Sequence, residues 1–246
     1  MAPTDERAGA AGVTVDVVMP ARDEVATIEA NIAAAQGCGV VREVIVVDDG
    51  SCDGTGGVAA VAGARVVRRS GPSGSKAHAM RMGVEASDAS HVLFVDADCT
   101  ELAAEHLAAI CEPVLAGRAE MSIGAFDYRR LNWLVLRCPP LSGERIVPRW
   151  VWDQIPPDRF DGYTIEVRLN EVIAEGHHRT VVRTMTGVYH RTKRDKFGPL
   201  DGMRRTWHMY RDLLSMLKPL GDVRWRTYPW YLRGLTIEAP AGPAPT

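Results

Sequence analysis

Residues 46–55 read VVDDGSCDGT, and they decide the fold that we expect for this chain. A short β-branched run delivers two carboxylates, Asp48 and Asp49, into a turn that contains Gly50 and Ser51. Placing acidic side chains directly after a buried strand is costly unless a cation or hydrogen-bond donors lie beside them. In open α/β sheets, ligands bind at this carboxyl edge of the strands. The stretch therefore predicts an open α/β sheet with a ligand site at that edge.

A second acidic strand exit lies in residues 91–100, HVLFVDADCT, where a strand-like run ends at Asp96 and Asp98. On alternate positions, two carboxylates can hold one hard divalent cation, which then bridges a diphosphate. A structural alternative is that these residues cap the helix that starts near Glu101. Together the two exits indicate a nucleotide and metal site.

Strand-like runs alternate with helical patterns through the first 120 residues. We expect strands at residues 13–19, 43–47, 64–68 and 91–95, and helices at residues 27–36, 53–61, 75–85 and 101–115. Such alternation is typical of a parallel sheet that is covered by helices on both faces.

The second half of the chain is less regular. We expect a strand at residues 119–127, a proline-rich loop at 138–148, a helix at 162–176, a strand at 180–186 and an amphipathic helix at 203–217. The helix at 162–176 is the strongest of these predictions, because its apolar residues recur at helical spacing.

The composition is that of an ordinary globular protein, with 46% hydrophobic and 24% charged residues in 246. No apolar run approaches the roughly 18–20 residues that span a bilayer. The first residues, MAPTDERAGAAG, lack the apolar core of a secretory signal. The five cysteines are odd in number and lack CxxC spacing, which favours reduced thiols over disulfides or a zinc site. We therefore expect a cytoplasmic protein.

Charge is distributed unevenly along the chain. Residues 1–176 carry 16 basic and 26 acidic side chains, a net charge of −10, whereas residues 177–246 carry 13 and 5, a net charge of +8. The basic end either meets anions or a membrane surface, or neutralises the acidic body. Its aromatic residues could lie at a membrane interface or across a dimer: Trp207, Trp225, Tyr228, Trp230 and Tyr231. No nucleic-acid-binding module accompanies them.

Two further segments carry candidate ligand-binding groups. In PARDE, Pro20 is expected just after the first strand, where it leaves the following backbone open to a flat ligand. Glu24 could instead satisfy a helix dipole. Asp49 can accept from a ribose hydroxyl or a uracil N–H. In GPSGSKA, Lys76 and the backbone amides suit a phosphate, although the segment is not a Walker A motif.

The motifs PARDE, VVDDGS, GSKA and VDAD, in this order, resemble those of the GT-A class of nucleotide-sugar glycosyltransferases. That class includes the polyprenyl-phosphate sugar synthases, such as dolichyl-phosphate mannose synthase. The resemblance implies an α/β, Rossmann-like, mostly parallel sheet flanked by helices, with a C-terminal acceptor-side helical extension. It also implies contacts with a nucleoside diphosphate, most often of uridine, from Pro20, Ala21, Glu24, Asp49 and Lys76.

The same resemblance implies that Asp98, helped by Asp96, binds Mg²⁺ or Mn²⁺. The family usually has Asn before the glutamate, whereas this chain has Asp23, so the local hydrogen bonding is expected to differ. We count Asp23 and Asp96 among the expected nucleotide contacts.

The second half resembles glucosyl-3-phosphoglycerate synthases. PLSGE is similar to their acceptor loop PLAGE, GYTIEVRLN is similar to their GYGVEIGL helix, and residues 187–193 resemble their HRNR segment, whose histidine is a metal ligand. The resemblance implies His190 as a third metal ligand, and acceptor contacts from Ser142, Gly143, Glu144, Arg191 and Lys193. The same elements also resemble polyprenyl-phosphate sugar synthases, which invert the anomeric configuration that the other enzymes retain.

A hydroxyl acceptor usually benefits from a general base, for which Glu166 and Asp161 are the available carboxylates on the expected acceptor side. We divide the chain into a disordered leader (1–12), a nucleotide-sugar-binding subdomain (13–127), an acceptor-side subdomain of the same domain (128–218) and a basic aromatic tail (219–246).

The function we expect is a metal-dependent glycosyltransferase that moves a sugar from a UDP-sugar to a small hydroxyl or phosphate acceptor. The alternatives are a peripheral-membrane polyprenyl-phosphate sugar synthase and a non-catalytic nucleotide-sugar-binding protein. A homodimer and membrane contact through the C-terminal tail are among the expected associations. The sugar, the acceptor and the anomeric outcome stay open.

Overall fold

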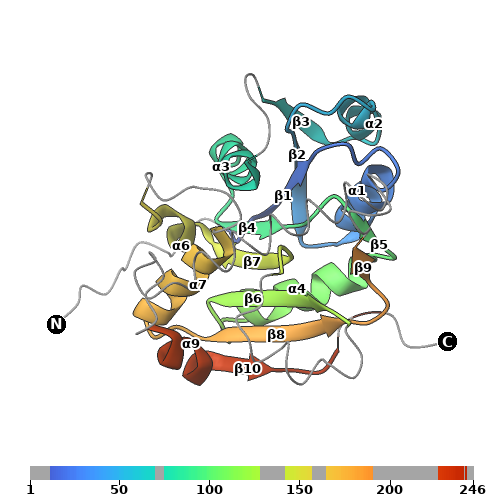
Figure 1. Cartoon of the computed structure of the whole chain (residues 1–246). Coiled ribbons are helices and arrows are strands. Elements are labelled where there is room, and N and C mark those ends of the chain that lie inside the picture. Colours follow the sequence, from blue (N-terminus) through green and yellow to red (C-terminus); the bar gives the residue numbers. More distant parts are fainter. Residues whose placement is uncertain are drawn as a thin grey trace, which may run out of the picture.

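A single mixed sheet organises the part of the chain that the structure describes, with the strand order β10-β8-β6-β7-β4-β1-β2-β3 (Figure 1). The structure is a computed structural model, and it describes residues 12–69, 75–127, 142–156, 165–190, 227–240 and 242, without the side chains of His190 and Tyr228. The expected helix at 203–217 and nearly all of the expected leader lie outside these residues.

The first half alternates strands and helices as predicted, and its four strands in the large sheet are parallel. In chain order the elements are β1 Val15–Ala21, α1 Ile28–Gly37, β2 Val41–Asp48, α2 Thr55–Val61, β3 Arg65–Arg68, α3 Lys76–Ala86, β4 His91–Phe94 and α4 Ala104–Leu115. The strands are β-branched and buried on both faces: Val17 and Val18 point to opposite sides of β1, and neither is exposed.

Two of the boundaries that differ from the sequence prediction lie near the candidate site. The first strand runs to Ala21, so Pro20 lies within β1, paired with Val47, rather than after the strand. The pairing of β4 with β1 ends at Val18, so at Pro20 the strand has β2 alone as a neighbour, which is the edge-like setting that proline tolerates. The fourth helix begins at Ala104 instead of residue 101, because Glu101 has a left-handed backbone (φ 60°) that a right-handed helix cannot contain.

The second half completes the sheet. It contains β6 Met121–Phe126, β7 Arg145–Pro148, α6 Arg149–Asp153, α7 Ile165–Glu175, β8 Thr180–Met185, α9 Tyr228–Gly234 and β10 Leu235–Ile237. The prediction of a loop at 138–148 is wrong for its last four residues, because β7 is antiparallel to both β4 and β6. With Arg145, Ile146 and Val147 buried, the strand has no polar alternation that would have revealed it.

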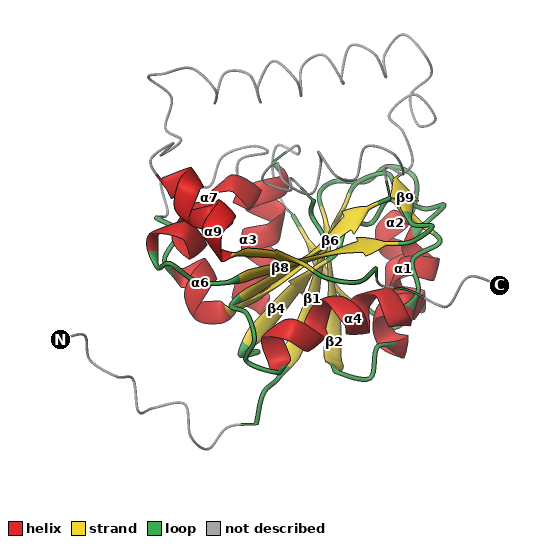
Figure 2. Cartoon of the chain, turned by 90° about the horizontal axis from the view of Figure 1, so that it is seen from below, coloured by secondary structure: helices red, strands yellow, loops and turns green. Residues whose placement is uncertain are grey.

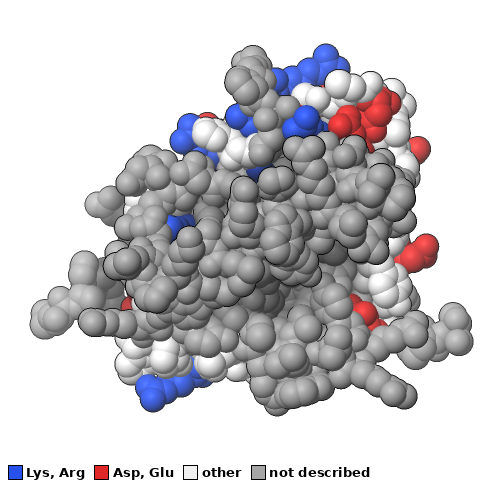
Figure 3. All heavy atoms as spheres, in the orientation of Figure 1, with Lys and Arg blue, Asp and Glu red and all other residues white. Residues whose placement is uncertain are grey.

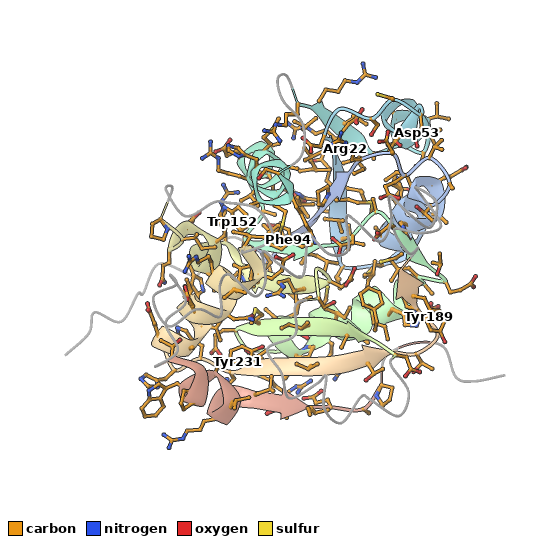
Figure 4. All side chains as sticks on the ribbon, viewed as in Figure 1. Arg22, Asp53, Phe94, Trp152, Tyr189 and Tyr231 are labelled. Atoms are coloured by element: carbon orange, nitrogen blue, oxygen red, sulfur yellow. The ribbon has the colours of Figure 1, made fainter. Side chains whose placement is uncertain are left out.

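Helices cover both faces of the sheet (Figure 2). One hydrophobic layer lies under α1, α2 and α4, and the other lies under α3, α6, α7 and α9. Phe94 of β4 and Trp152 of α6 meet in the second layer, with ring centroids 5.3 Å apart (Figure 4). Because each layer combines residues from both halves of the chain, the two halves share one core.

The expected tail contributes to this core. Tyr231 of α9 is 2% exposed, so the expectation that it lies at a membrane or dimer interface is wrong. Trp230 is 44% exposed and packs edge-on against His177, with Arg233 over its ring. Among the described helices, none is long and apolar enough to cross a membrane.

Candidate active site

The strand exits named in the sequence converge at one edge of the sheet. β1 lies between β2 and β4, with Ala21 beside Asp48 and Val18 beside Phe94. The amide of Asp49 donates to the carbonyl of Ala21 at 2.9 Å, which ties the first two exits together. The segments that follow β1, β2 and β4 therefore surround one region at the carboxyl edge, where open α/β sheets bind ligands.

The segment after β1 wraps onto the segment after β2. Asp23 has a left-handed backbone (φ 55°), and its Oδ1 accepts from the amide of Cys52 at 2.9 Å. Asn and Asp tolerate this backbone better than other non-glycine residues, which explains how Asp replaces the usual Asn. Next in the chain, Glu24 is 7% exposed and its amide donates to Thr55 Oγ1 at 2.9 Å. Each of these bonds fixes the backbone of one exit to the other.

The two carboxylates after β2 have different surroundings. Asp48 accepts from the amide of Ser51 at 2.9 Å and packs against Gly56, where a Cβ would lie 3.2 Å from its Cγ. Asp49 instead forms an ion pair of 2.8 Å with Arg69, a residue that the sequence interpretation missed. Arg69 follows β3, which pairs with β2, so the strand order was the signal that could have located it. Asp48 therefore braces the turn, while Asp49 has a cationic partner.

Acidic and basic side chains lie close together at this corner of the molecule. On the face shown in Figure 3, acidic groups gather near α2 and basic groups over β3 and α3. Arg22 and Asp53 lie in the same region (Figure 4). Burial opposes ionisation of Asp53, but hydrogen bonds from Thr55 and from the amide of Val25 outweigh it and lower the pKa of Asp53.

The turn between Asp96 and Asp98 is held through its backbone. The carbonyl of Ala97 accepts from Thr27 Oγ1 at 2.7 Å and from Asn31 Nδ2 at 2.9 Å, and Asn31 also donates to the carbonyl of Cys99. These donors come from Thr27, just before α1, and from Asn31 in its first turn, and they bind the backbone of the turn. The alternative that this turn caps the next helix is wrong, because that helix begins only at Ala104.

A small second sheet brings a distant segment to this turn. β5 Cys99–Thr100 pairs antiparallel with β9 Tyr189–His190, so the backbone of His190 lies directly opposite Cys99. Thr100 Oγ1 also donates to the carbonyl of Tyr189 at 3.0 Å. No set of three metal-ligating side chains is assembled among the described residues, which do not include the imidazole of His190. The pairing nevertheless brings the backbone of His190 next to the residue that follows Asp98.

Two carboxylates on alternate positions of a backbone-clamped turn suit a hard divalent cation, and an imidazole beside them is compatible with Mg²⁺ or Mn²⁺. Asp96, Asp98 and His190 are the residues that could hold such an ion. Their role as ligands stays a prediction.

Lys76 lies between two carboxylates from opposite halves of the chain. Its Nζ is 2.6 Å from Asp96 Oδ1 and 3.0 Å from Glu166 Oε1, and Glu166 is 4% exposed. Burial disfavours the ammonium, but Asp96, Glu166 and then Glu144 outweigh it and hold the pKa of Lys76 well above its usual value. Ser75 caps α3 by accepting from the amide of His78, which fixes Lys76 at the first position of the helix. The lysine therefore joins the carboxylate of Asp96, after β4, to that of Glu166 in α7.

The segment before β7 packs against the carboxylate of Asp96. Gly143 packs against Asp96 so closely that a Cβ would lie 2.6 Å from both Cγ and Oδ1 of the carboxylate. Glu144, an expected acceptor contact, is fully buried in this structure, and its role toward an acceptor stays a prediction. Its carboxylate accepts from Ser142 Oγ at 2.5 Å and from Cys99 Sγ at 3.2 Å. Burial and the charges of Glu144 and Asp96 raise the pKa of Cys99, which keeps this thiol protonated.

The remaining expected site residues lie outside the described part of the chain: Asp161, Arg191 and Lys193. The structure thus brings together residues from both halves of the chain, whose roles stay predictions: Pro20, Ala21, Asp23, Glu24, Asp49, Lys76, Asp96, Asp98, Ser142, Gly143 and Glu166.

Comparison with known proteins identifies relatives of this arrangement. The chain is 35% identical over 133 residues to a glucosyl-3-phosphoglycerate synthase of Mycolicibacterium paratuberculosis, covering 51% of this chain and 40% of the relative. A synthase of the same name from Mycobacterium tuberculosis is 34% identical over 131 residues, with coverage of 50% and 40%. The matched region thus spans less than half of the length of these curated relatives.

The similarity to solved structures extends over more of the chain. The Mycobacterium tuberculosis glucosyl-3-phosphoglycerate synthase in complex with Mn²⁺, UDP and phosphoglyceric acid superposes with a TM-score of 0.70 at 28% identity, covering 84% of this chain and 78% of that one. The same enzyme with Mg²⁺ and UDP gives a TM-score of 0.70 at 27% identity and the same coverage. This likeness confirms the predicted α/β fold of GT-A type. The family model of glycosyl transferase family 2 matches residues 16–157, more than half of the chain. The chain belongs to glycosyl transferase family 2.

Proposed function

We propose that this protein is a metal-dependent glycosyltransferase that transfers a sugar from a UDP-sugar to a small acceptor carrying a hydroxyl or phosphate group. One observation supports the proposal most directly: Asp49, the Asp96–Asp98 turn and the backbone of His190 converge at one edge of the sheet. Lys76 connects this edge to Glu166, because its ammonium pairs with both Asp96 and Glu166. Relatives with this fold bind UDP with Mn²⁺ or Mg²⁺, which supports the choice of donor and metal.

The donor half follows from the strand exits. Pro20, Ala21, Asp23, Glu24 and Asp49 would bind the nucleoside, while Asp96, Asp98 and His190 would hold Mg²⁺ or Mn²⁺. When bound, the cation would neutralise negative charge on the departing diphosphate. Lys76 is close enough to Asp96 to serve the same phosphates, because its ammonium is a mobile point charge.

The acceptor half is assigned to Glu166, Asp161, Ser142, Gly143, Arg191 and Lys193. Glu166 is held by Lys76 and would orient or deprotonate an acceptor hydroxyl. A related enzyme was solved with phosphoglyceric acid, which supports a small anionic acceptor that carries a hydroxyl group. A basic segment after His190 suits such an anion electrostatically.

The test is ligand-induced stabilisation followed by turnover. UDP with Mn²⁺ should raise the melting temperature more than GDP or ADP with Mn²⁺, since a ligand that binds only the folded state stabilises it. UDP-glucose with 3-phosphoglycerate is the first donor and acceptor pair to assay for UDP release. Asp98→Ala should lose the Mn²⁺-dependent shift, whereas Asp88→Ala, at an exposed site by Arg42, should keep it. A donor that binds without turnover on any acceptor would support the non-catalytic alternative.

One observation favours the alternative of a polyprenyl-phosphate acceptor. In α9, Trp230 and Leu232 are 44% and 39% exposed, next to Arg233, and such side chains suit a headgroup region. Sedimentation with anionic vesicles tests it: binding that Trp230→Ser weakens would favour a polyprenyl-phosphate acceptor. If vesicles do not bind while UDP-glucose turns over, the lipid alternative is wrong. Sedimentation velocity in the same buffer would report the expected homodimer.

A further inference from the structure

Arg145, the first residue of β7, is a fully buried guanidinium. A buried charge is costly unless its hydrogen-bond donors have acceptors. Three nitrogen atoms of this guanidinium have such acceptors. Nε and Nη2 donate to the carbonyl of Ser142 at 3.1 and 2.5 Å, and Nη1 donates to the carbonyl of Glu166 at 3.2 Å and to Asn170 Oδ1 at 3.0 Å. One side chain therefore links the segment before β7 to the first two turns of α7.

Both of the linked segments contribute residues to the candidate active site. The first contains Gly143, which packs against the carboxylate of Asp96. The second contains Glu166, whose carboxylate reaches Lys76. The spacing between the Asp96 side and the Glu166 side thus depends on how these two segments are held together. Arg145 donates to the carbonyl of Ser142, the neighbour of Gly143, and to the carbonyl of Glu166.

We propose that Arg145 is a positioning residue for sugar transfer: its planar guanidinium sets the distance and orientation of Glu166 relative to Asp96 and Gly143. The inference rests on the proposed function, because it assigns Glu166 to the acceptor side. Arg145 has no exposed surface, so it acts on the reaction through Glu166 and the backbone around Gly143. The rigid fork matters, since a lysine ammonium is a point charge and cannot reproduce divergent donors in one plane.

A purely structural role makes a different prediction. An arginine needed only to fill the core could be replaced by an apolar side chain of similar volume with little effect on a folded enzyme. A positioning role predicts a lower kcat in protein that is folded and binds UDP normally. A displacement of about 1 Å in a reacting group can cost about 100-fold in rate.

The experiment compares Arg145→Lys and Arg145→Met with the wild type. Melting temperature, UDP affinity with Mn²⁺, kcat and the acceptor KM are measured for each. Arg168→Lys is the matched control, because Arg168 is 7% exposed on the same α7 helix and pairs with Glu171 at 2.8 Å, away from Lys76. We expect kcat to fall about tenfold in Arg145→Lys and about 100-fold in Arg145→Met. UDP affinity should stay within about threefold, and Arg168→Lys should keep its kcat within about twofold.

Several results would overturn the inference. A folded Arg145→Lys with the kcat of the wild type would do so, as would a loss no larger than that of Arg168→Lys at the same melting temperature. If Arg145→Met does not fold, Arg145→Lys decides alone, with amide hydrogen exchange of residues 142–144 and 165–170 as its second readout. Exchange there should quicken in the folded variant, and unchanged exchange would count against positioning. A wild type without turnover on any acceptor would refute the proposed function and this inference together, whereas an active wild type with an unimpaired Arg145→Lys refutes the inference alone.

Discussion

Replacing Lys76 by methionine removes the ammonium that lies 2.6 Å from Asp96 and 3.0 Å from Glu166. Methionine keeps most of the volume and the helix preference of lysine at the start of α3. The two carboxylates stay in place, with side chains that are 16% and 5% exposed, and they lose the cation between them. We therefore expect Lys76→Met to fold less stably.

The size of the effect follows from burial. Removing one partner of a buried ion pair costs about 3–5 kcal/mol, because the remaining charge is left uncompensated. The Lys76 side chain is 23% exposed, so water partly screens the site and the lower end of that range applies. We expect a decrease of about 3 kcal/mol in the free energy of unfolding without metal, measured by urea denaturation with an unchanged m-value.

The effect of Lys76→Met on stability should depend on Mn²⁺ and on pH. Mn²⁺ should stabilise Lys76→Met more than the wild type, because the cation then meets an acidic pair that no ammonium competes for. The pKa of Lys76 is raised in the folded state, so the stability from its ion pairs is fully present below the ordinary lysine pKa of 10.5 and is lost as the pH rises through the folded pKa. The difference between wild type and variant should therefore be constant from about pH 7 to 9 and shrink above 10.5.

Arg81→Met on the same helix is the matched control. Arg81 lies 3.3 Å from Glu85 at the surface, one turn along the helix, and such pairs contribute about 0.3–0.5 kcal/mol. If Lys76→Met is no less stable than Arg81→Met, or if Mn²⁺ stabilises both variants and the wild type equally, Lys76 does not neutralise the two carboxylates. The electrostatic account of the site would then be wrong.

Three further predictions concern the surroundings of the site. In Gly143→Ala, the added methyl group would overlap the carboxylate of Asp96. The affinity for UDP in the presence of Mn²⁺, measured from the stabilisation that the ligand gives, should therefore fall at least about tenfold while far-UV circular dichroism stays unchanged. In Asn31→Ala, the carbonyls of Ala97 and Cys99 lose the donor Asn31 Nδ2, and the carbonyl of Ala97 keeps Thr27 Oγ1. The free energy of unfolding should fall by about 2 kcal/mol in urea, with weaker Mn²⁺ binding by calorimetry; a loss of stability without any change in Mn²⁺ binding would contradict the bracing role. Burial lowers the pKa of His106, whose Nδ1 accepts from the amide of Ala103. Its stabilisation is present above the ordinary pKa of 6.5 and lost as the pH falls through the folded value, so His106→Gln should flatten the stability profile below pH 6.5.

The alternation of strands and helices in the first half could be predicted because it depends on local properties. Strands such as β2 are β-branched runs that are buried on both faces, and the helices between them show their own apolar spacing. Asp49 and Asp96 could be placed at the same edge for a related reason, since parallel strands carry whatever follows them to one side of the sheet. Strand order was not needed for that inference.

What depended on strand order could not be predicted. β7 is four residues long and enters between β4 and β6, and nothing in its sequence distinguishes it from a loop. Arg69 meets Asp49 only because β3 lies beside β2, and Arg145 is buried only because β7 lies beneath α7. The burial of Glu144 could not be predicted either, since a sequence motif does not tell which face of a turn its side chain occupies.

Asp96 is where these non-local contacts meet, and it links the two halves of the site mechanically. It follows β4, contacts Lys76 at the start of α3, and lies against Gly143 in the segment before β7. A shift of its carboxylate must therefore also displace Lys76 at the start of α3 or the tightly packed backbone of Gly143. Since Lys76 also holds Glu166, a change in charge near Asp96 reaches the carboxylate of Glu166 through one ammonium, without any movement of the sheet.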